Sequence, residues 1–240
     1  MSMRQVTEAL ILKTTKYGDT SVIVHAYTRL FGLTAFIARG VRKKGAKIHI
    51  ALLQPMNLTQ IVFSPAKSGT LGHLSEITLT TIYQTIPFDV NKNAILLFIN
   101  EILYKSLKEE QPNETLFDYI KNFFITLDDQ KEHFSNNHLF FMAGLTHHFG
   151  IFPNFEKKGW FDLMEGISVS LKPLHEYAIS NEEAVLFKML FSTPEKEQNR
   201  IKINASERNM LLDMLLKYYA LHIPGMETIQ SKKILHQILH

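Results

Sequence analysis

Hydrophobic and polar residues alternate along the first third of the chain with the two-residue period of β-strands. Val22, Val24 and Ala26 fall on one face of such a run, and the residues between them fall on the other. Turns marked by glycine separate similar runs. The pattern predicts strands over residues 5–16, 20–28, 33–41, 53–63 and 70–80. Five strands in about eighty residues favour an OB-type barrel over a sandwich, which usually has seven or more strands.

After Pro87 the hydrophobic positions take up the spacing of amphipathic helices. Two of these helices begin with capping-box spacing, at Ser180 with Glu183 and at Asn204 with Glu207. Residues 151–175 interrupt the helical pattern and predict a small hairpin. The predicted helices cover residues 91–109, 113–128, about 136–150, 180–192, 204–222 and 228–239. The sequence therefore predicts a multidomain α+β protein, with an OB-fold domain over residues 1–82 and a mostly helical domain over residues 83–240.

Charge is distributed unevenly between these two parts. Residues 1–81 carry ten Lys and Arg against three acids, whereas residues 82–240 carry sixteen against twenty. Five of the positive charges lie in the stretch Ala38–Lys47, which follows the third predicted strand. Such a segment suits a cationic loop that presents long side chains to a polyanion, although most charge runs are solvated turns.

The composition excludes several kinds of chemistry. The chain has no cysteine, which rules out disulfides, thiol catalysis and cysteine-ligated zinc. The sequence contains no phosphate-binding glycine loop, nucleophile elbow or zinc-protease motif, and the eleven histidines are scattered. We therefore expect no enzyme activity, no cofactor and no metal. No membrane span or signal peptide is predicted either, so a cytoplasmic protein is expected.

The surroundings of the basic stretch favour nucleic acid as the polyanion. Lys13 and Lys16 lie toward the end of the first predicted strand, Arg29 lies in the next turn, and aromatic residues are interleaved with them. Cations that follow phosphates beside rings that stack on bases suit binding of single-stranded nucleic acid. Tyr17 is expected to be exposed and Phe36 to lie in the core. The candidate DNA-binding residues are Lys13, Lys16, Tyr17, Arg39, Arg42, Lys43, Lys44 and Lys47.

Four blocks in the N-terminal part resemble the RecO family of bacterial recombination mediators. They are residues 9–24, residues 27–32, the start of the basic stretch at 38–44, and Leu53-Gln-Pro-Met at 53–56. The family has matching blocks in the same order and with suitable gaps. The later chain fits in places, at Asn100-Glu-Ile-Leu, at Leu116-Phe117 and at Phe149-Gly-Ile-Phe-Pro153.

The resemblance implies a DNA-binding OB-fold joined to a helical domain. It implies a protein that binds single- and double-stranded DNA, anneals strands, and works with RecR to load recombinase onto DNA coated by single-strand-binding protein. It also implies a nucleoid-associated protein. Many members carry four zinc-binding cysteines after the Gly-x-x-Pro block. Here residues 154–172 have none, so we expect a metal-free hairpin with apolar contacts from Trp160, Phe161 and Leu163.

The resemblance further implies that the helical domain binds the acidic C-terminal tail of single-strand-binding protein. A tail that ends in an aromatic residue and a carboxylate requires an apolar pocket rimmed by cations. The candidate residues are Arg208, Lys217, Lys232 and Lys233. The alternative function is that of a non-enzymatic adaptor whose basic barrel loop docks an acidic protein partner.

Overall fold

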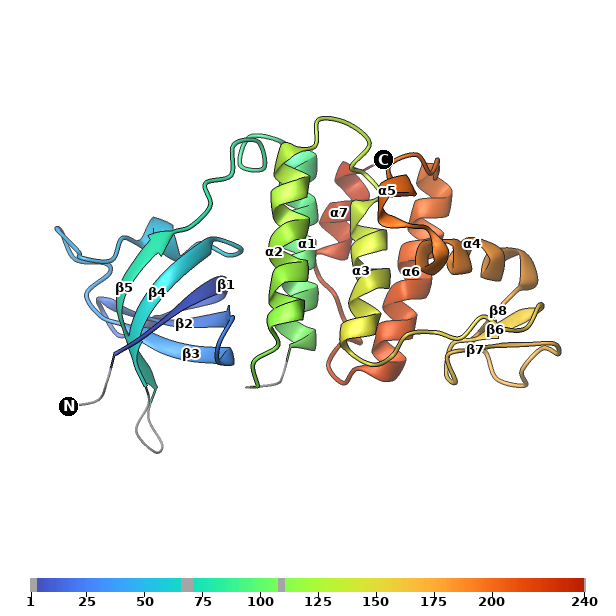
Figure 1. Ribbon diagram of the computed structural model, residues 1–240, viewed down its shortest axis with the longest axis horizontal. Helices are drawn as coiled ribbons and strands as arrows, with labels where there is room; N and C mark the ends of the chain where they lie inside the picture. The colour runs from blue at the N-terminus through green and yellow to red at the C-terminus, as the bar shows by residue number, and fades with distance from the viewer. Residues whose placement is uncertain (1–3, 66–70, 108–110, 240) are drawn as a thin grey trace. The chain divides into compact units, whose positions relative to one another are not determined.

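The computed structural model describes residues 4–65, 71–107 and 111–239. The chain divides into two compact units. The first unit comprises residues 1–88 and 96–128, and the second comprises residues 89–95 and 129–240. Figure 1 shows the barrel strands of the first unit and the helices and small sheet of the second.

The first unit is built on a closed five-stranded barrel with strand order β1-β2-β3-β5-β4. Its strands are β1 Gln5–Tyr17, β2 Ser21–Thr28, β3 Gly32–Ala38, β4 Leu58–Ser64 and β5 Gly72–Leu79. Neighbouring strands are antiparallel except β3 and β5, which pair in parallel at Phe36 with Gly72. The predicted OB-type barrel followed by a mostly helical region is confirmed.

The predicted alternation on β2 is also confirmed. Val22, Val24 and Ala26 lie in the barrel core together with Phe36, which is fully buried as expected. Tyr27, on the opposite face of β2, is buried as well, because its ring stacks on Phe117 with ring centroids 6.2 Å apart. Both faces of this strand are therefore covered within the first unit.

Two strand boundaries differ from the prediction by three residues or more. β3 ends at Ala38 instead of continuing to Val41, because the chain leaves the sheet at the basic stretch. β4 begins at Leu58 instead of Leu53, because Ile50–Leu53 forms the 3-10 helix η1 and Met56 has a φ of 66°. The sequence also predicts a loop over residues 64–69, of which residues 66–69 lie outside the described residues, as do the predicted start of the fifth strand at residue 70 and the predicted helix end at residue 109.

Helices α1 Val90–Ser106 and α2 Glu114–Asp129 follow the barrel. Asp128, near the end of α2, accepts hydrogen bonds from the backbone N–H groups of Gln84, Thr85 and Ile86 at 2.7–2.8 Å. Burial disfavours ionisation of this carboxyl, but the three N–H groups outweigh that effect and lower its pKa. The segment that leaves β5 is thus fixed to α2 by one carboxylate.

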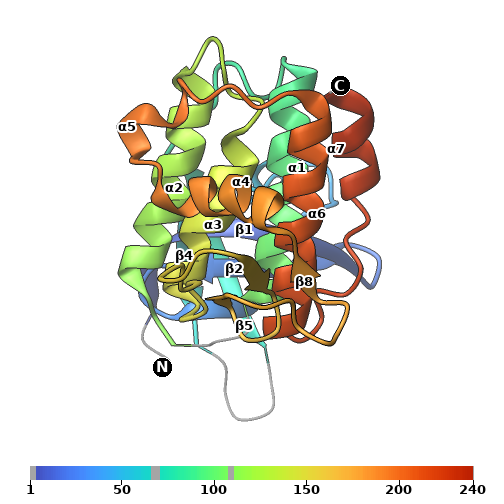
Figure 2. The ribbon, with the colours of Figure 1, turned by 90° about the vertical axis from the view of Figure 1, so that its right-hand side faces the viewer.

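The second unit contains α3 Asn137–His148, α4 Asn181–Ser192, α5 Glu195–Gln198, α6 Ala205–His222 and α7 Lys232–Ile238. Both predicted capping boxes are present, at the starts of α4 and α6. α7 lies beside α6 in Figure 2, and the ion pair between Lys232 and Asp213 joins the two helices. The last helix begins at Lys232 instead of Thr228, and the short helix α5 was not predicted.

The predicted hairpin consists of β6 Trp160–Asp162 and β7 Ile167–Val169, and β8 Ala178–Ile179 extends it to a three-stranded sheet. Phe161 and Leu163 are buried, as expected. The Phe161 ring lies against Phe187 of α4 and Tyr218 of α6, at centroid distances of 5.4 and 6.4 Å. Trp160 is only half-buried, so its predicted apolar contact holds in part.

The hairpin packs closely against α6 at Gly166, where the Tyr218 hydroxyl approaches the backbone. The φ of Gly166 is +67°, and a Cβ placed there would lie 2.7 Å from the Tyr218 hydroxyl oxygen. That hydroxyl is itself held, because it donates to the Ile151 carbonyl at 2.7 Å. Gly150 has nearly the same φ, +68°, but a Cβ placed on Gly150 would have nothing within 4 Å.

The substitution Gly166→Ala is therefore expected to destabilise the protein more than Gly150→Ala. Both variants place alanine in the left-handed region, at a cost of about 1–2 kcal/mol. Only Gly166→Ala adds a steric clash with Tyr218. Urea unfolding followed by circular dichroism measures both free energies of unfolding, and equal losses would show that the clash is absent.

Candidate nucleic-acid interface

The basic loop, defined here as residues 39–47, leaves the barrel after β3 and carries no regular secondary structure. Two apolar residues fix it, since Val41 and Ile48 are 4% and 5% exposed and belong to the barrel core. Between them the backbone makes two successive turns, with hydrogen bonds from Lys43 N–H to the Gly40 carbonyl and from Ala46 N–H to the Lys43 carbonyl. The loop is thus anchored at both sides of its charged section.

The charged side chains of this loop are directed into solvent. Arg39, Arg42, Lys43 and Lys44 are exposed, and none of them lies within ion-pair distance of a carboxylate among the described residues. Four cations held close together without counter-charges repel one another and attract an anion. A chain of phosphates is such an anion, since it carries several negative charges in a row.

The basic loop meets the turn between β1 and β2 at one end of the barrel. The Arg42 N–H donates to the Thr20 carbonyl at 3.3 Å. Lys16 pairs with Val22, and Tyr17 pairs with Ser21 in the β1–β2 ladder. Tyr17 is 53% exposed, as expected from the sequence. The structure therefore brings Lys16 and Tyr17 to the same end of the barrel as the loop.

Lys13 is separated from this group by a change of face along β1. Residues opposite one another in an antiparallel pair share a face. Lys16 is opposite the core residue Val22, whereas Lys13 is opposite His25, after a register shift between Ile11 and Lys13. The Lys13 ammonium lies 4.7 Å from the ring centroid of Tyr104 in α1. Burial and the charge of Lys13 lower the pKa of His25.

Lys47, the last cation of the loop, has a counter-charge. Its ammonium lies 2.9 Å from a carboxylate oxygen of Glu76 in β5, although no acid is near it in the sequence. Arg4 approaches the same carboxylate at 3.9 Å. The hydrogen bond and charge of Lys47 lower the pKa of Glu76. Lys47 is thus partly neutralised, unlike the four cations before it.

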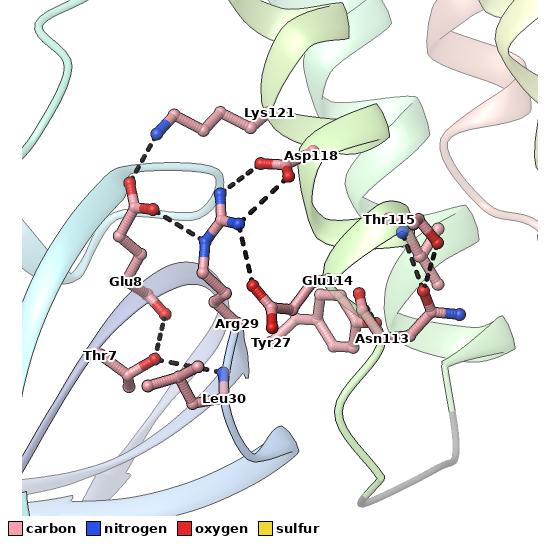
Figure 3. Close-up of polar contacts among 11 residues, drawn as sticks. Thr7, Glu8, Tyr27, Arg29, Leu30, Asn113, Glu114, Thr115, Asp118 and Lys121 are labelled. Atoms are coloured by element: carbon pink, nitrogen blue, oxygen red, sulfur yellow. Dashed lines mark hydrogen bonds and ion pairs between the residues drawn. The ribbon is translucent and has the colours of Figure 1, made fainter.

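Arg29 makes its contacts within the first unit, between the barrel and α2, and is not part of the basic loop (Figure 3). Its guanidinium is only 21% exposed and donates to Glu8 at 2.9 Å, to Glu114 at 3.3 Å and to both oxygens of Asp118. The hydrogen bond to Asp118 raises the pKa of Arg29 further. This network, called the Arg29 network below, ties the barrel to α2. Sequence reasoning missed it because its partners are far apart in the chain.

Glu8 connects the Arg29 network to a second cation. The Lys121 ammonium of α2 lies 2.5 Å from the other Glu8 carboxylate oxygen (Figure 3). Burial disfavours the charged carboxylate, but the hydrogen bonds and charges of Lys121 and Arg29 outweigh burial, and the pKa of Glu8 is lowered from its ordinary value. Glu8 is therefore ionised at neutral pH and can pair with both cations.

The four candidate cations for a partner's acidic tail differ in the contacts that they already make within the protein. Arg208 donates to the Asn136 side chain at 2.8 Å and to the carbonyls of Leu239 and Ile203. Lys232 pairs with Asp213 at 2.5 Å, and the Lys217 ammonium lies 4.8 Å from the Tyr177 ring centroid. Lys233 is exposed, and no described carboxylate lies within ion-pair distance of it. Three of these four cations thus have partners within the described protein, and the role of all four in binding a partner stays a prediction.

A zinc ion does not fit the residues of the hairpin segment. The chain has no cysteine, and the described residues contain no group of three or more His, Asp or Glu that could hold a metal ion. Asp162 is instead paired with His175 at 3.1 Å, while its other oxygen accepts hydrogen bonds from the N–H groups of Met164 and Glu165.

Among the described residues, no helix is both long and apolar enough to cross a membrane.

Comparison with known proteins places the chain in a class. It is 30% identical to the DNA repair protein RecO of Phocaeicola vulgatus over 98% of this chain and 99% of that protein. It is 31% identical to the protein of the same name from Bacteroides fragilis, with the same coverage. For the one from Christiangramia forsetii, identity is 33% over 97% of this chain and 98% of the relative. These relatives are all DNA repair proteins.

Two family models match successive parts of the chain. The model of the recombination protein O N terminal part covers residues 1–83, and that of the C terminal part covers residues 87–228. The chain belongs to the recombination protein O (RecO) family of DNA repair proteins, as the four N-terminal sequence blocks predicted.

Removing the cation at the centre of the Arg29 network is expected to destabilise the protein. Arg29→Met leaves three carboxylates close together without their shared donor, and should lower the free energy of unfolding by about 1–2 kcal/mol. Lys47→Met is the control, because it breaks an ion pair whose lysine is 73% exposed. That change should stay within about 0.5 kcal/mol. Urea unfolding compares the two, and similar losses would mean that the Arg29 network adds nothing to stability.

Proposed function

We propose that the chain binds DNA through the barrel end formed by the basic loop, Lys16 and Tyr17. The observation that carries this proposal is the group of four exposed loop cations without a described carboxylate partner. Val41 and Ile48 hold the loop on the barrel, so its backbone is already positioned before DNA arrives. Phosphate contacts of this kind position a protein without reading the base sequence, and little sequence preference is expected.

Strand annealing follows from the same contacts. Cations that neutralise phosphates reduce the repulsion between two strands and leave base edges free to pair. Tyr17 supplies an exposed ring on which a base can stack. Together with the family membership, this supports a recombination mediator that anneals strands and helps to load recombinase onto single-stranded DNA coated by single-strand-binding protein. No catalytic step is required of the chain itself.

We also propose a division of labour at the boundary predicted from the sequence. Residues 1–82 would form the DNA-binding domain, and residues 83–240 would bind protein partners, with residues 151–175 as a metal-free remnant of the zinc module. The proposed partners are RecR and the acidic C-terminal tail of single-strand-binding protein. Of the four candidate tail-binding cations, Lys233 is exposed and has no described ion pair, whereas Arg208 is engaged by internal acceptors.

The triple variant Arg42→Ala, Lys43→Ala and Lys44→Ala tests the loop. Its affinity for labelled single-stranded DNA should fall, and the slope of log affinity against log salt should become shallower by about 2, since each phosphate contact contributes about 0.7. Fluorescence anisotropy over a series of salt concentrations measures both quantities.

The matched control removes the same charge from exposed positions of the second unit, with Lys196→Ala, Arg200→Ala and Lys202→Ala. It should keep the parent's slope. If the loop variant also keeps the parent's affinity and slope, the basic loop is a solvated turn. Binding of an acidic protein by the loop, without affinity for DNA, would favour the adaptor function.

The two lysines of β1 provide a second test. Lys16→Ala should weaken binding of single-stranded DNA roughly three- to tenfold at low salt, because it removes a phosphate contact at the barrel end. Lys13→Ala should change affinity less than twofold, roughly, because the Lys13 ammonium is directed at Tyr104. The same anisotropy titration measures both. A larger effect of Lys13→Ala would place the DNA on the outer face of β1 instead.

A further inference from the structure

The hairpin of the second unit carries a second group of cations beside an aromatic ring. Lys157 and Lys158 lie in the exposed segment that leads into β6, and Trp160 is the first residue of that strand. Trp160 pairs with Val169, so the chain just after β7 returns beside it. There the Lys172 ammonium lies 5.1 Å from the Trp160 ring centroid. These four residues are called the hairpin patch.

The three lysines of the hairpin patch have no counter-charge among the described residues. Within that part of the chain no ion pair involves any of them, and the exposed acid Glu156, next to Lys157 in the chain, forms none with them. Asp162, the nearest acid within β6, is directed inward and paired with His175. The arrangement resembles that of the basic loop, since unpaired cations adjoin a partly exposed ring.

The hairpin patch rests on a rigid support. Phe155, just before Lys157, stacks on Phe161 with ring centroids 4.8 Å apart, and Phe161 is fully buried. The Phe187 ring of α4 lies 6.2 Å from Phe155. A backbone held on such a base loses little conformational entropy when a ligand binds. The exposed Leu171 and Leu174, on the arm that carries Lys172, add apolar surface for unpaired bases.

We propose that the hairpin patch is a second contact site for single-stranded DNA. Phosphates pair with Lys157, Lys158 and Lys172, and a base lies against the Trp160 indole. Cations beside an aromatic face are the combination that binds single strands, whereas a folded acidic protein has no need of a stacking ring. This inference takes its ligand, single-stranded DNA, from the proposed function and rests on that function. It also deepens the proposed function, because annealing requires two DNA strands and this site would let the second unit hold one of them.

The test uses a spectroscopic property of this chain. Trp160 is its only tryptophan, so intrinsic tryptophan fluorescence reports on the hairpin alone. Adding an oligothymidylate of about 15 nucleotides to the full-length protein should quench this fluorescence saturably. The hairpin variant Lys157→Ala, Lys158→Ala and Lys172→Ala should need roughly tenfold more DNA for half-maximal quenching. The control with Lys196, Arg200 and Lys202 changed to alanine should titrate like the parent.

Outcomes at the two sites are distinguishable. The loop variant at Arg42, Lys43 and Lys44 should retain the quenching, and its residual anisotropy signal should fall further when Trp160→Ala is added. Quenching that is unchanged in the hairpin variant overturns the inference and leaves the barrel site standing. Equal quenching by a polyglutamate peptide overturns it as well, because the patch would then bind any polyanion. If the parent binds no DNA by either measurement, the proposed function fails. Circular dichroism melting checks that each variant folds.

Discussion

The guanidinium of Arg29 is the centre of an ion-pair network that holds the barrel to α2. Three carboxylates from β1 and α2 share its donors, and Lys121 neutralises one of them from the other side. Stacking of Tyr27 on Phe117 adds apolar contact beside these charges. Because α2 also fixes the segment after β5 through Asp128, the barrel's position in the first unit depends on charges that α2 provides.

The positive charges of the first unit therefore fall into two groups, those that contact other parts of the unit and those that are exposed to solvent. Arg29 and Lys13 face helices, where a carboxylate or an aromatic ring receives them. The loop cations from Arg39 to Lys44 face solvent, where nothing in the described chain receives them. Lys47 stands between these two groups because Glu76 is near it. The net charge of the domain does not separate paired cations from exposed ones. The contacts of each side chain do.

The sequence predicted the parts of the structure that depend on local pattern. Alternation on β2 placed Val22, Val24 and Ala26 in the core, and the capping boxes located the starts of α4 and α6. It failed where the chain makes non-local contacts. Val41 was assigned to the end of the third strand, but it enters the core from the basic loop.

The same limit applies to the candidate site. Tyr17 was expected to be exposed because it precedes Gly-Asp, and it is. The separation of Lys13 from Lys16 depends on a register shift in β1 that no local pattern signals. Likewise the pairing of Lys47 with Glu76 joins residues 29 positions apart. The predicted domain boundary after residue 82 and the residues that contact DNA stay predictions.

The hairpin of the second unit shows what replaces a metal when its ligands are absent. Phe161 packs among the rings of Phe155, Phe187 and Tyr218, and the Asp162–His175 pair closes the sheet from its polar side. Because the segment contains no thiol and its described residues form no set of metal ligands, it offers no thiolate–zinc site that an oxidant or a chelator could break. The folding of this hairpin therefore does not depend on the redox state of a thiol.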